Sequence, residues 1–301
     1  MSHAPAAAGP WDDAPAGPVD AIEASEVDRL GRELKQLRAE NARLSRLLES
    51  RGQDTRHPRL TAMVGAVSGT ALGRLLAHRW REVAATAGAL RPELDAVLAG
   101  GAASPSLVRR LAPTLGLHTA DLFVVAGLDL PPDLVPASGT GSWHVGTVLE
   151  RAAKLAPQSL RRLHEFVRSL PEHPPAWPPV RSRYSYPLGP GEMMLRLLRN
   201  RNIGSYSPKV LWFIGDGPMV SPSTIAMLGP GRTRLTPQYV TAFATVLGIP
   251  DDDVAAVAGV AAATDPRLHR NHVELARLAW DARRLTEEQL SEVLDLARRL
   301  W

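Results

Sequence analysis

Apolar residues alternate at spacings of three and four between positions 26 and 51, which is the first clear pattern along the chain. Written as heptads, this pattern keeps a and d apolar for over three repeats, apart from one asparagine at a. Such a seam pairs two helices, and a lone Asn at a favours a parallel two-stranded register. Residues 22–52 are therefore predicted to form a dimeric coiled coil, with one helix packed on its own domain as the alternative. The seam residues are Val27, Leu30, Leu34, Leu37, Asn41, Leu44 and Leu48.

The remainder of the chain contains an internal duplication. The segment "SPSLVRRLAPTLGLHTADLFVVAGL" (104–128) aligns without gaps to "TPQYVTAFATVLGIPDDDVAAVAGV" (236–260), and Asp121 thereby matches Asp253. Downstream, "KLAPQSLRRLHEFVRSL" parallels "RLTEEQLSEVLDLARRL" in the same order and at nearly the same offset. The periodicity is helical, and no strand-like alternation persists. The sequence therefore predicts an all-α protein built from two homologous helical units.

We call these units repeat one (residues 60–172) and repeat two (residues 186–301). Within each, one helix is predicted to begin at a Ser/Thr-Pro pair, with the hydroxyl residue as N-cap and proline at the first helical position. These pairs are Ser104-Pro105 and Thr236-Pro237. Residues 1–21 are rich in Ala, Pro and Gly and are predicted to be disordered, and residues 173–185 form a Pro-rich linker. Trp80, Trp212 and Trp280 lie in periodic helical segments and are predicted to be core residues.

Composition narrows the class of protein. The chain has no cysteine, which excludes disulfides, Cys-ligated zinc and thiol nucleophiles. Its net charge of +4 is too mild to argue for nucleic acid without further evidence. The first residues lack the charged and apolar regions of a secretory signal, and no apolar run is long enough for a membrane span. We therefore expect a soluble cytoplasmic protein with no membrane partner.

A motif in repeat two carries the functional hypothesis. The segment "SPKVLWFIGDGPMVSPSTIAML" (207–228) fits a helix, a tight turn through Gly215 and Gly217, and a second helix capped by Ser221. The segment "GPGRTRLTPQYVTAFATVLGIPDDDV" follows it. Together, over residues 207–254, they resemble the phage-repressor-like (XRE-type) helix-turn-helix family. The resemblance implies a five-helix DNA-binding fold, with the second helix of the motif in the major groove of duplex DNA.

The same resemblance implies which side chains meet DNA. The residues expected at the groove are Ser223, Thr224 and Met227, beside the N-cap Ser221. Since this helix is uncharged where many family members carry Arg, Gln or Asn, base readout should be limited. Positive charges around the motif are expected to clamp phosphates, with a solvated basic face as the alternative. They are Lys209, Arg196, Arg199, Arg201, Arg232 and Arg234.

The equivalent helix of repeat one, "ALRPELDAVLAGG", places Glu93 and Asp95 where DNA phosphates would approach. Repeat one is therefore expected to serve dimerisation, ligand sensing or a protein partner. The predicted function is a dimeric DNA-binding transcriptional regulator or architectural protein, associated with the nucleoid. The alternative is a coiled-coil adaptor that binds other proteins, in which both helix-turn-helix repeats have lost DNA binding.

No catalytic or cofactor site is predicted. His269 and His272 lie one helical turn apart with Glu274 nearby, but no third metal ligand is evident, so a surface role is favoured. The glycine-rich segment "SGTGS" lacks the flanking strand and lysine of a phosphate-binding loop. No Ser/His/Asp spacing stands out. The sequence thus predicts a protein that is not an enzyme, with no metal and no cofactor.

Overall fold

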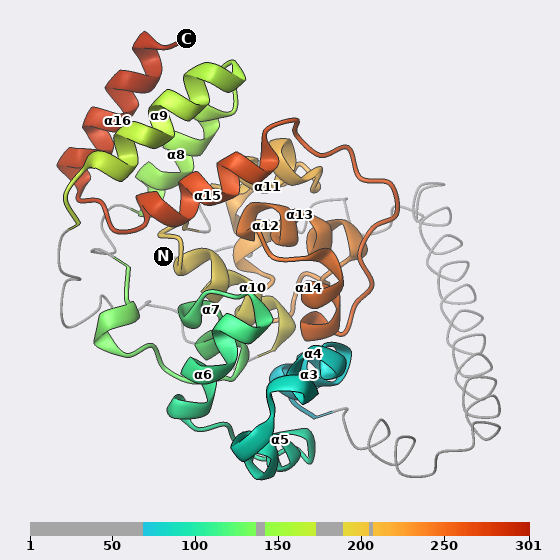
Figure 1. Ribbon diagram of the computed structural model, residues 1–301. Helices are drawn as coiled ribbons and strands as arrows, with labels where there is room; N and C mark the ends of the chain where they lie inside the picture. The colour runs from blue at the N-terminus through green and yellow to red at the C-terminus, as the bar shows by residue number, and fades with distance from the viewer. Residues whose placement is uncertain (1–68, 137–141, 173–188, 205–206) are drawn as a thin grey trace, which may run out of the picture. The chain divides into compact units, whose positions relative to one another are not determined.

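A computed structural model of the protein describes residues 69–136, 142–172, 189–204 and 207–301 (Figure 1). Within these ranges every regular element is a helix, so the predicted all-α class is confirmed for the part that the structure describes. The chain divides into two units, residues 1–61 and 62–301, and all described residues belong to the second. The predicted tail (1–21), coiled-coil seam (22–52) and Pro-rich linker (173–185) lie outside the described residues.

Repeat one begins with a series of short helices and ends with a helical hairpin. The helices are α3 (Ala71–His78), α4 (Trp80–Thr86), η2 (Gly88–Leu90), α5 (Arg91–Leu98), α6 (Pro105–Leu115), α7 (Thr119–Val125), η3 (Pro132–Leu134), α8 (Ser142–Ala152) and α9 (Pro157–Ser169). Repeat two has the same order: α10 (Pro190–Arg199), α11 (Pro208–Gly215), α12 (Pro222–Ala226), α13 (Pro237–Leu247), α14 (Asp251–Ala258), α15 (His272–Ala282) and α16 (Glu287–Arg299).

The ends of the duplicated helices follow from the repeated residues. The Ser104 hydroxyl accepts a hydrogen bond from the Leu107 amide at 3.2 Å, as the N-cap prediction requires. Thr236 occupies the N-cap position of α13, although its side chain makes no cap hydrogen bond. Both helices end at a glycine in the left-handed region, Gly116 at φ 65° and Gly248 at φ 67°. A glycine adopts this conformation without a Cβ clash, which explains the shared Leu-Gly ending.

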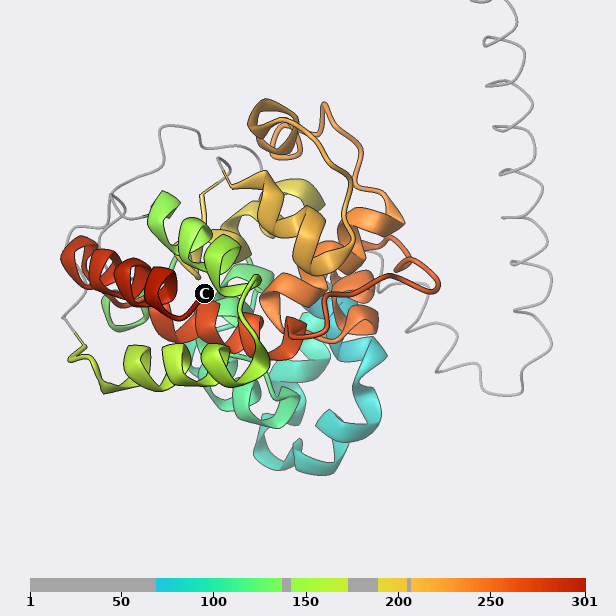
Figure 2. The ribbon, with the colours of Figure 1, turned by 90° about the horizontal axis from the view of Figure 1, so that it is seen from above.

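The two repeats exchange contacts instead of forming separate bodies. Helix α3 of repeat one packs on α14 of repeat two, and α10 of repeat two packs on α7 of repeat one. The hairpins do the same, since α8 lies against α16 and α9 against α15. Figures 1 and 2 show these four helices together from two directions. Reciprocal contacts of this kind are the pattern of an isologous dimer interface, here formed within one chain.

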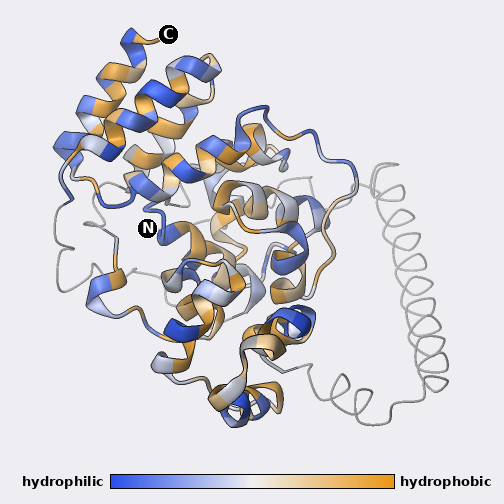
Figure 3. Cartoon of the chain, viewed as in Figure 1, coloured by the Kyte–Doolittle hydropathy of each residue, from blue (hydrophilic) through white to orange (hydrophobic). Residues whose placement is uncertain are grey.

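The side chains of α11 divide into a buried and an exposed face. Val210, Leu211 and Ile214 are buried, where α11 meets α13, α8 and α15. Trp212 points away from this face and is 45% exposed, so its predicted place in the core is wrong. Trp80 and Trp280 are partly buried. The coloured stripes in Figure 3 show the same division into apolar and polar faces along α9 and α16.

One buried histidine links the two hairpins. His164 of α9 makes a very short contact through Nδ1 to Glu274, and its Nε2 lies 2.7 Å from Asp281, both carboxylates belonging to α15. An imidazole donates from both nitrogens only when it is protonated. The hydrogen bond with Asp281 raises the pKa of His164 most, burial opposes this, and Glu274 raises the pKa further. The bridge between α9 and α15 is therefore an imidazolium held by two carboxylates.

The His164 bridge predicts a pH-dependent stability. A raised folded-state pKa stabilises fully below the ordinary histidine pKa of about 6.5, and the contribution is lost as pH rises through the folded value. We expect the difference in free energy of unfolding between wild type and His164→Gln to shrink from pH 7 to pH 9. Burial lowers the pKa of His118 to about 4, so the His118→Gln difference should stay constant over that range. Urea unfolding at several pH values measures both differences, and a flat His164 profile would contradict the charged bridge.

Candidate nucleic-acid interface

The predicted helix-turn-helix segment forms a helix, a connection and a short second helix. Helix α11 ends at Gly215, and Asp216 follows in the left-handed region at φ 56°. The Gly217 amide donates to the Leu211 carbonyl at 3.0 Å, which closes the turn. Helix α12 then begins at Pro222 behind its N-cap Ser221, whose hydroxyl accepts from the Thr224 amide at 3.3 Å. The predicted cap is thus confirmed, whereas the connection between the helices, residues 216–221, is longer than the predicted tight turn, and α12 itself spans five residues.

The polar side chains of α12 gather at its exposed start. The Ser221 hydroxyl lies 2.7 Å from that of Ser223 and 3.0 Å from that of Thr224. Ser221 and Ser223 are exposed, and Thr224 is half-buried. Met227 is also half-buried, and its carbonyl accepts from the Thr233 amide at 3.0 Å, so the following loop folds back on the helix. The resulting surface offers hydroxyl groups and carries no charge on the helix.

Cations before and after α12 in the sequence have no carboxylate partners among the described residues. Lys209, Arg232 and Arg234 are all exposed. Among the described residues, no carboxylate forms an ion pair with any of them. The sequence from Gly217 to Pro250 contains no Asp or Glu at all. We call residues 221–234, which include Arg232 and Arg234, the α12 end. It is a continuous stretch of chain whose only charges are positive.

Two further predicted phosphate contacts are partly neutralised. Arg196 lies 3.5 Å from Asp129, and the Arg196 side chain is 26% exposed. Arg199 forms a very short hydrogen bond with Glu192, whose side chain is buried on the first turn of α10. Both arginines therefore already have carboxylate neighbours within the protein, which weakens them as phosphate ligands.

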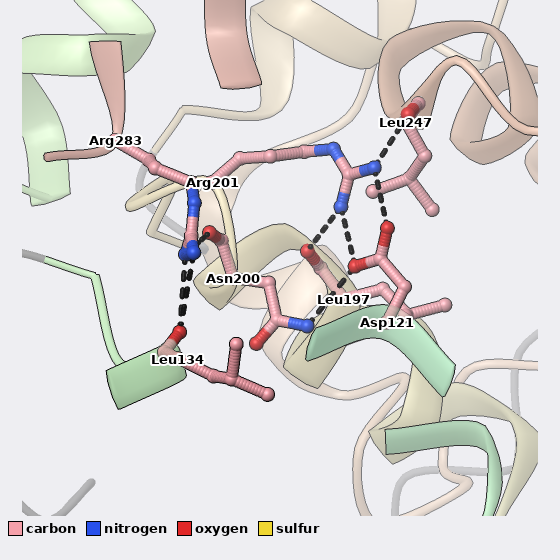
Figure 4. A network of polar contacts seen from close by, with 7 residues as sticks. All are labelled: Asp121, Leu134, Leu197, Asn200, Arg201, Leu247 and Arg283. Carbon is pink, nitrogen blue, oxygen red and sulfur yellow. Dashed lines mark hydrogen bonds and ion pairs between the residues drawn. The ribbon is translucent and has the colours of Figure 1, made fainter. Parts of the chain in front are cut away.

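Arg201 has a different role from the one predicted. Its side chain is fully buried and binds Asp121 of α7 in a bidentate pair, with both nitrogen–oxygen distances 2.8 Å (Figure 4). It also donates to the carbonyls of Leu197 and Leu247, at 3.2 and 2.5 Å. A guanidinium with no exposed surface cannot touch a phosphate, so the prediction of Arg201 as a DNA contact is wrong. It joins repeat two to repeat one.

The neighbours of Arg201 complete a buried polar network. The Asn200 amide donates to Asp121 at 3.0 Å, and Arg283 donates to the carbonyls of Leu134 and Asn200 at 3.2 and 3.3 Å. The ring of Trp280 lies 4.1 Å from the Arg283 guanidinium carbon and 5.3 Å from that of Arg201. Burial lowers the pKa of Arg283 to about 10. Periodicity did not identify these residues, because Asp121 and Arg201 are 80 positions apart.

A second arginine–aspartate pair stands at the equivalent place. The sequences "LGRLLAHR" (72–79) and "MLRLLRNR" (194–201) match at Arg79 and Arg201, just as Asp253 matches Asp121. Arg79 Nε lies 3.8 Å from Asp253, and both buried carboxylate oxygens of Asp253 lack a hydrogen-bond partner in the described part of the chain. Burial raises the pKa of Asp253. The two pairs therefore occupy equivalent positions, but only the Arg201–Asp121 pair is joined by hydrogen bonds.

The equivalent end of repeat one is charged differently. Arg91 pairs with Asp95 at 3.0 Å within α5, and Glu93 pairs with Arg110 of α6 at 2.9 Å. Glu93 also accepts a hydrogen bond from Ser104 at 3.0 Å. We call Arg91, Glu93, Asp95 and Arg110 the α5 end. Its four charges cancel, in contrast to the α12 end.

His269 and His272 make their hydrogen bonds within their own turn. The His272 ring lies 2.9 Å from the carbonyl of His269 through Nδ1, and the Asn271 amide donates to the His269 ring at 3.2 Å. Across the described ranges, no three His, Cys, Asp or Glu side chains are grouped as metal ligands would be. Within the same residues, no helix combines the length and the apolar character that crossing a bilayer requires.

Comparison of the chain with protein-family models, with curated protein sequences and with solved structures found no match.

Proposed function

We propose that the protein is a DNA-binding transcriptional regulator or architectural protein that contacts duplex DNA through the α12 end. The observation that carries this proposal is the set of exposed cations, Lys209, Arg232 and Arg234, which have no carboxylate partner in the described residues. Phosphate contacts supply most of the sequence-independent affinity for DNA. In this proposal α11 and α12 form the helix-turn-helix of a repressor-like unit, and the segment 22–52 pairs two chains.

The chemistry of α12 sets how DNA would be read. Hydroxyl groups of Ser223 and Thr224 can contact phosphates or several bases, so they discriminate weakly between base pairs. The half-buried Met227 offers only an apolar contact, such as a thymine methyl. Recognition would then depend on backbone contacts and on DNA shape, with a dimer fixing the spacing of two contacts. A protein of this kind would be associated with the nucleoid.

Removing the two arginines of the α12 end tests the proposal. For Arg232→Ala with Arg234→Ala, we expect weaker binding to a GC-rich duplex. We also expect a slope of log affinity against log salt that is shallower by about 1.8, which corresponds to two phosphates. The measurement is fluorescence anisotropy over a series of salt concentrations. The matched control is Arg161→Ala with Arg162→Ala, two exposed arginines on α9, and it should leave the slope unchanged. Equal losses in both variants would mean that exposed arginines contribute to binding wherever they lie. That result would overturn the assignment of the α12 end as the DNA contact.

An adaptor that binds other proteins is the second candidate, because large apolar side chains are exposed near the motif. Trp212 of α11 is 45% exposed, and Met219 in the turn before α12 is 74% exposed. Large exposed apolar side chains can mark protein contacts when they form a patch. No retention of the protein on DNA at any salt concentration would favour this adaptor over a DNA-binding regulator.

A further inference from the structure

The two ends of the duplicated fold differ in how their arginines are used. In repeat two, Arg232 and Arg234 are exposed and lack carboxylate partners among the described residues. In repeat one, Arg91 and Arg110 are also exposed, but each pairs with a carboxylate of α5, Asp95 and Glu93 respectively. Both ends thus carry two arginines, although at different positions, since Arg110 lies on α6 and aligns with Ala242 whereas Arg232 and Arg234 precede α13. Only one end carries acidic residues.

These ion pairs affect the net charge of the α5 end more than the stability of the fold. The side chains of Arg91 and Asp95 are 53% and 48% exposed, and those of Arg110 and Glu93 are 49% and 41% exposed. Exposed pairs of this kind contribute little to folding, because water and salt screen them. A DNA phosphate that approached the α5 end would meet two carboxylates as close as the arginines. The favourable exchange of counterions for arginines would then be cancelled.

The geometry also shows that the carboxylates are held at this end by more than one contact. Glu93 bonds both Arg110 and Ser104, and Ser104 is the N-cap of α6, so the carboxylate is tied to the start of the next helix. Asp95 lies one helical turn after Arg91 and makes two contacts to the same guanidinium nitrogen, at 3.0 and 3.2 Å. The neutralisation is therefore fixed by the fold of repeat one.

We infer that repeat one carries a second end able to contact DNA, which Glu93 and Asp95 keep silent, so that each chain binds one half-site of DNA. A half-site here means the stretch of duplex covered by one helix-turn-helix unit. This inference rests on the proposed function. It makes the chain single-headed despite its two repeats, and two half-sites are bound only when two chains come together.

The test removes the carboxylates and keeps their shape. We expect full-length Glu93→Gln with Asp95→Asn to bind a GC-rich duplex more tightly than wild type. Its salt slope should be steeper by about 1.8, for the two released arginines. Its DNase footprint should be longer. The matched control is Glu172→Gln with Asp295→Asn, which removes two other carboxylates paired with Arg284 and Arg298. The control should leave the footprint at its wild-type length.

The outcomes separate the inference from the proposed function. An equal change in the Glu93/Asp95 variant and in the control would overturn the inference, and so would a loss of wild-type binding on Arg91→Ala with Arg110→Ala. If Arg232→Ala with Arg234→Ala leaves binding unchanged while the Glu93/Asp95 variant lengthens the footprint, the proposed role of the α12 end fails, and only the part of the inference that concerns the α5 end stands. If neither wild type nor the Glu93/Asp95 variant binds DNA, both are wrong. Thermal unfolding of each variant confirms that it is folded.

Discussion

Arg201→Ala is expected to lower the free energy of unfolding by about 3–5 kcal/mol, because it leaves the buried carboxylate of Asp121 without its charged partner. Both side chains are fully buried, and the pair spans the contact between α7 and α10. The loss would therefore appear as a weakened contact between the two repeats. Urea unfolding followed by circular dichroism measures the change.

The equivalent pair supplies the control. Arg79→Ala should cost less than Arg201→Ala, because Arg79 lies 3.8 Å from Asp253, beyond hydrogen-bond distance, and both oxygens of Asp253 already lack a hydrogen-bond partner in the described residues. A second comparison separates the pair from its isolated charge. Replacing both partners, with Arg201→Met and Asp121→Leu, should recover most of the stability, since apolar replacements of a buried pair are often neutral. Equal losses for Arg201→Ala and Arg79→Ala would contradict the difference between the two pairs.

Gly215→Ala is expected to destabilise the protein by about 1–3 kcal/mol or more, because α11 approaches α13 too closely for a side chain. A Cβ at Gly215 would lie 2.6 Å from the Cα and 2.8 Å from the carbonyl oxygen of Ala242. Both are backbone atoms, so the helices themselves would have to move apart. We expect faster hydrogen exchange in α11 and a loss of DNA binding along with the lower stability.

Gly69→Ala is the control for this substitution. A Cβ at Gly69 meets nothing within 4 Å, and this glycine has no positive φ, so the change should stay within about 0.5 kcal/mol. Urea unfolding of the two variants gives the comparison directly. If Gly215→Ala were as stable as Gly69→Ala, the close contact between α11 and α13 would be wrong.

Local features of this fold could be predicted from the sequence because their causes are local. The Ser-Pro pairs at 104 and 221 mark helix starts, and the Leu-Gly pairs at 115 and 247 mark helix ends, since capping and left-handed glycine act within a few residues. The duplication also allowed helices predicted in one repeat to be predicted at the equivalent positions of the other. The charges of the α12 end were visible for the same reason, as they follow α12 directly in the chain.

Features that depend on distant partners could not be predicted in this way. Arg201 looked like one more surface cation next to Arg196 and Arg199, and only the fold brings Asp121 to it. The position of Trp212 was missed because nearly all of α11 is apolar, so periodicity could not decide which face is buried. The exchange of helices between repeats is likewise not a property of either repeat alone.

The exchanged hairpins also determine when the fold can form. Helix α8 is covered by α16, and α9 by α15, so the apolar faces of repeat one stay open until the last helices of repeat two have been made. A chain grows from its N-terminus at about 5–20 residues per second, and contacts between distant segments close slowly. The packing of repeat one can therefore be completed only after repeat two has been synthesised. Once both repeats are present, their association is intramolecular. Its strength therefore does not depend on the concentration of the protein in the cell.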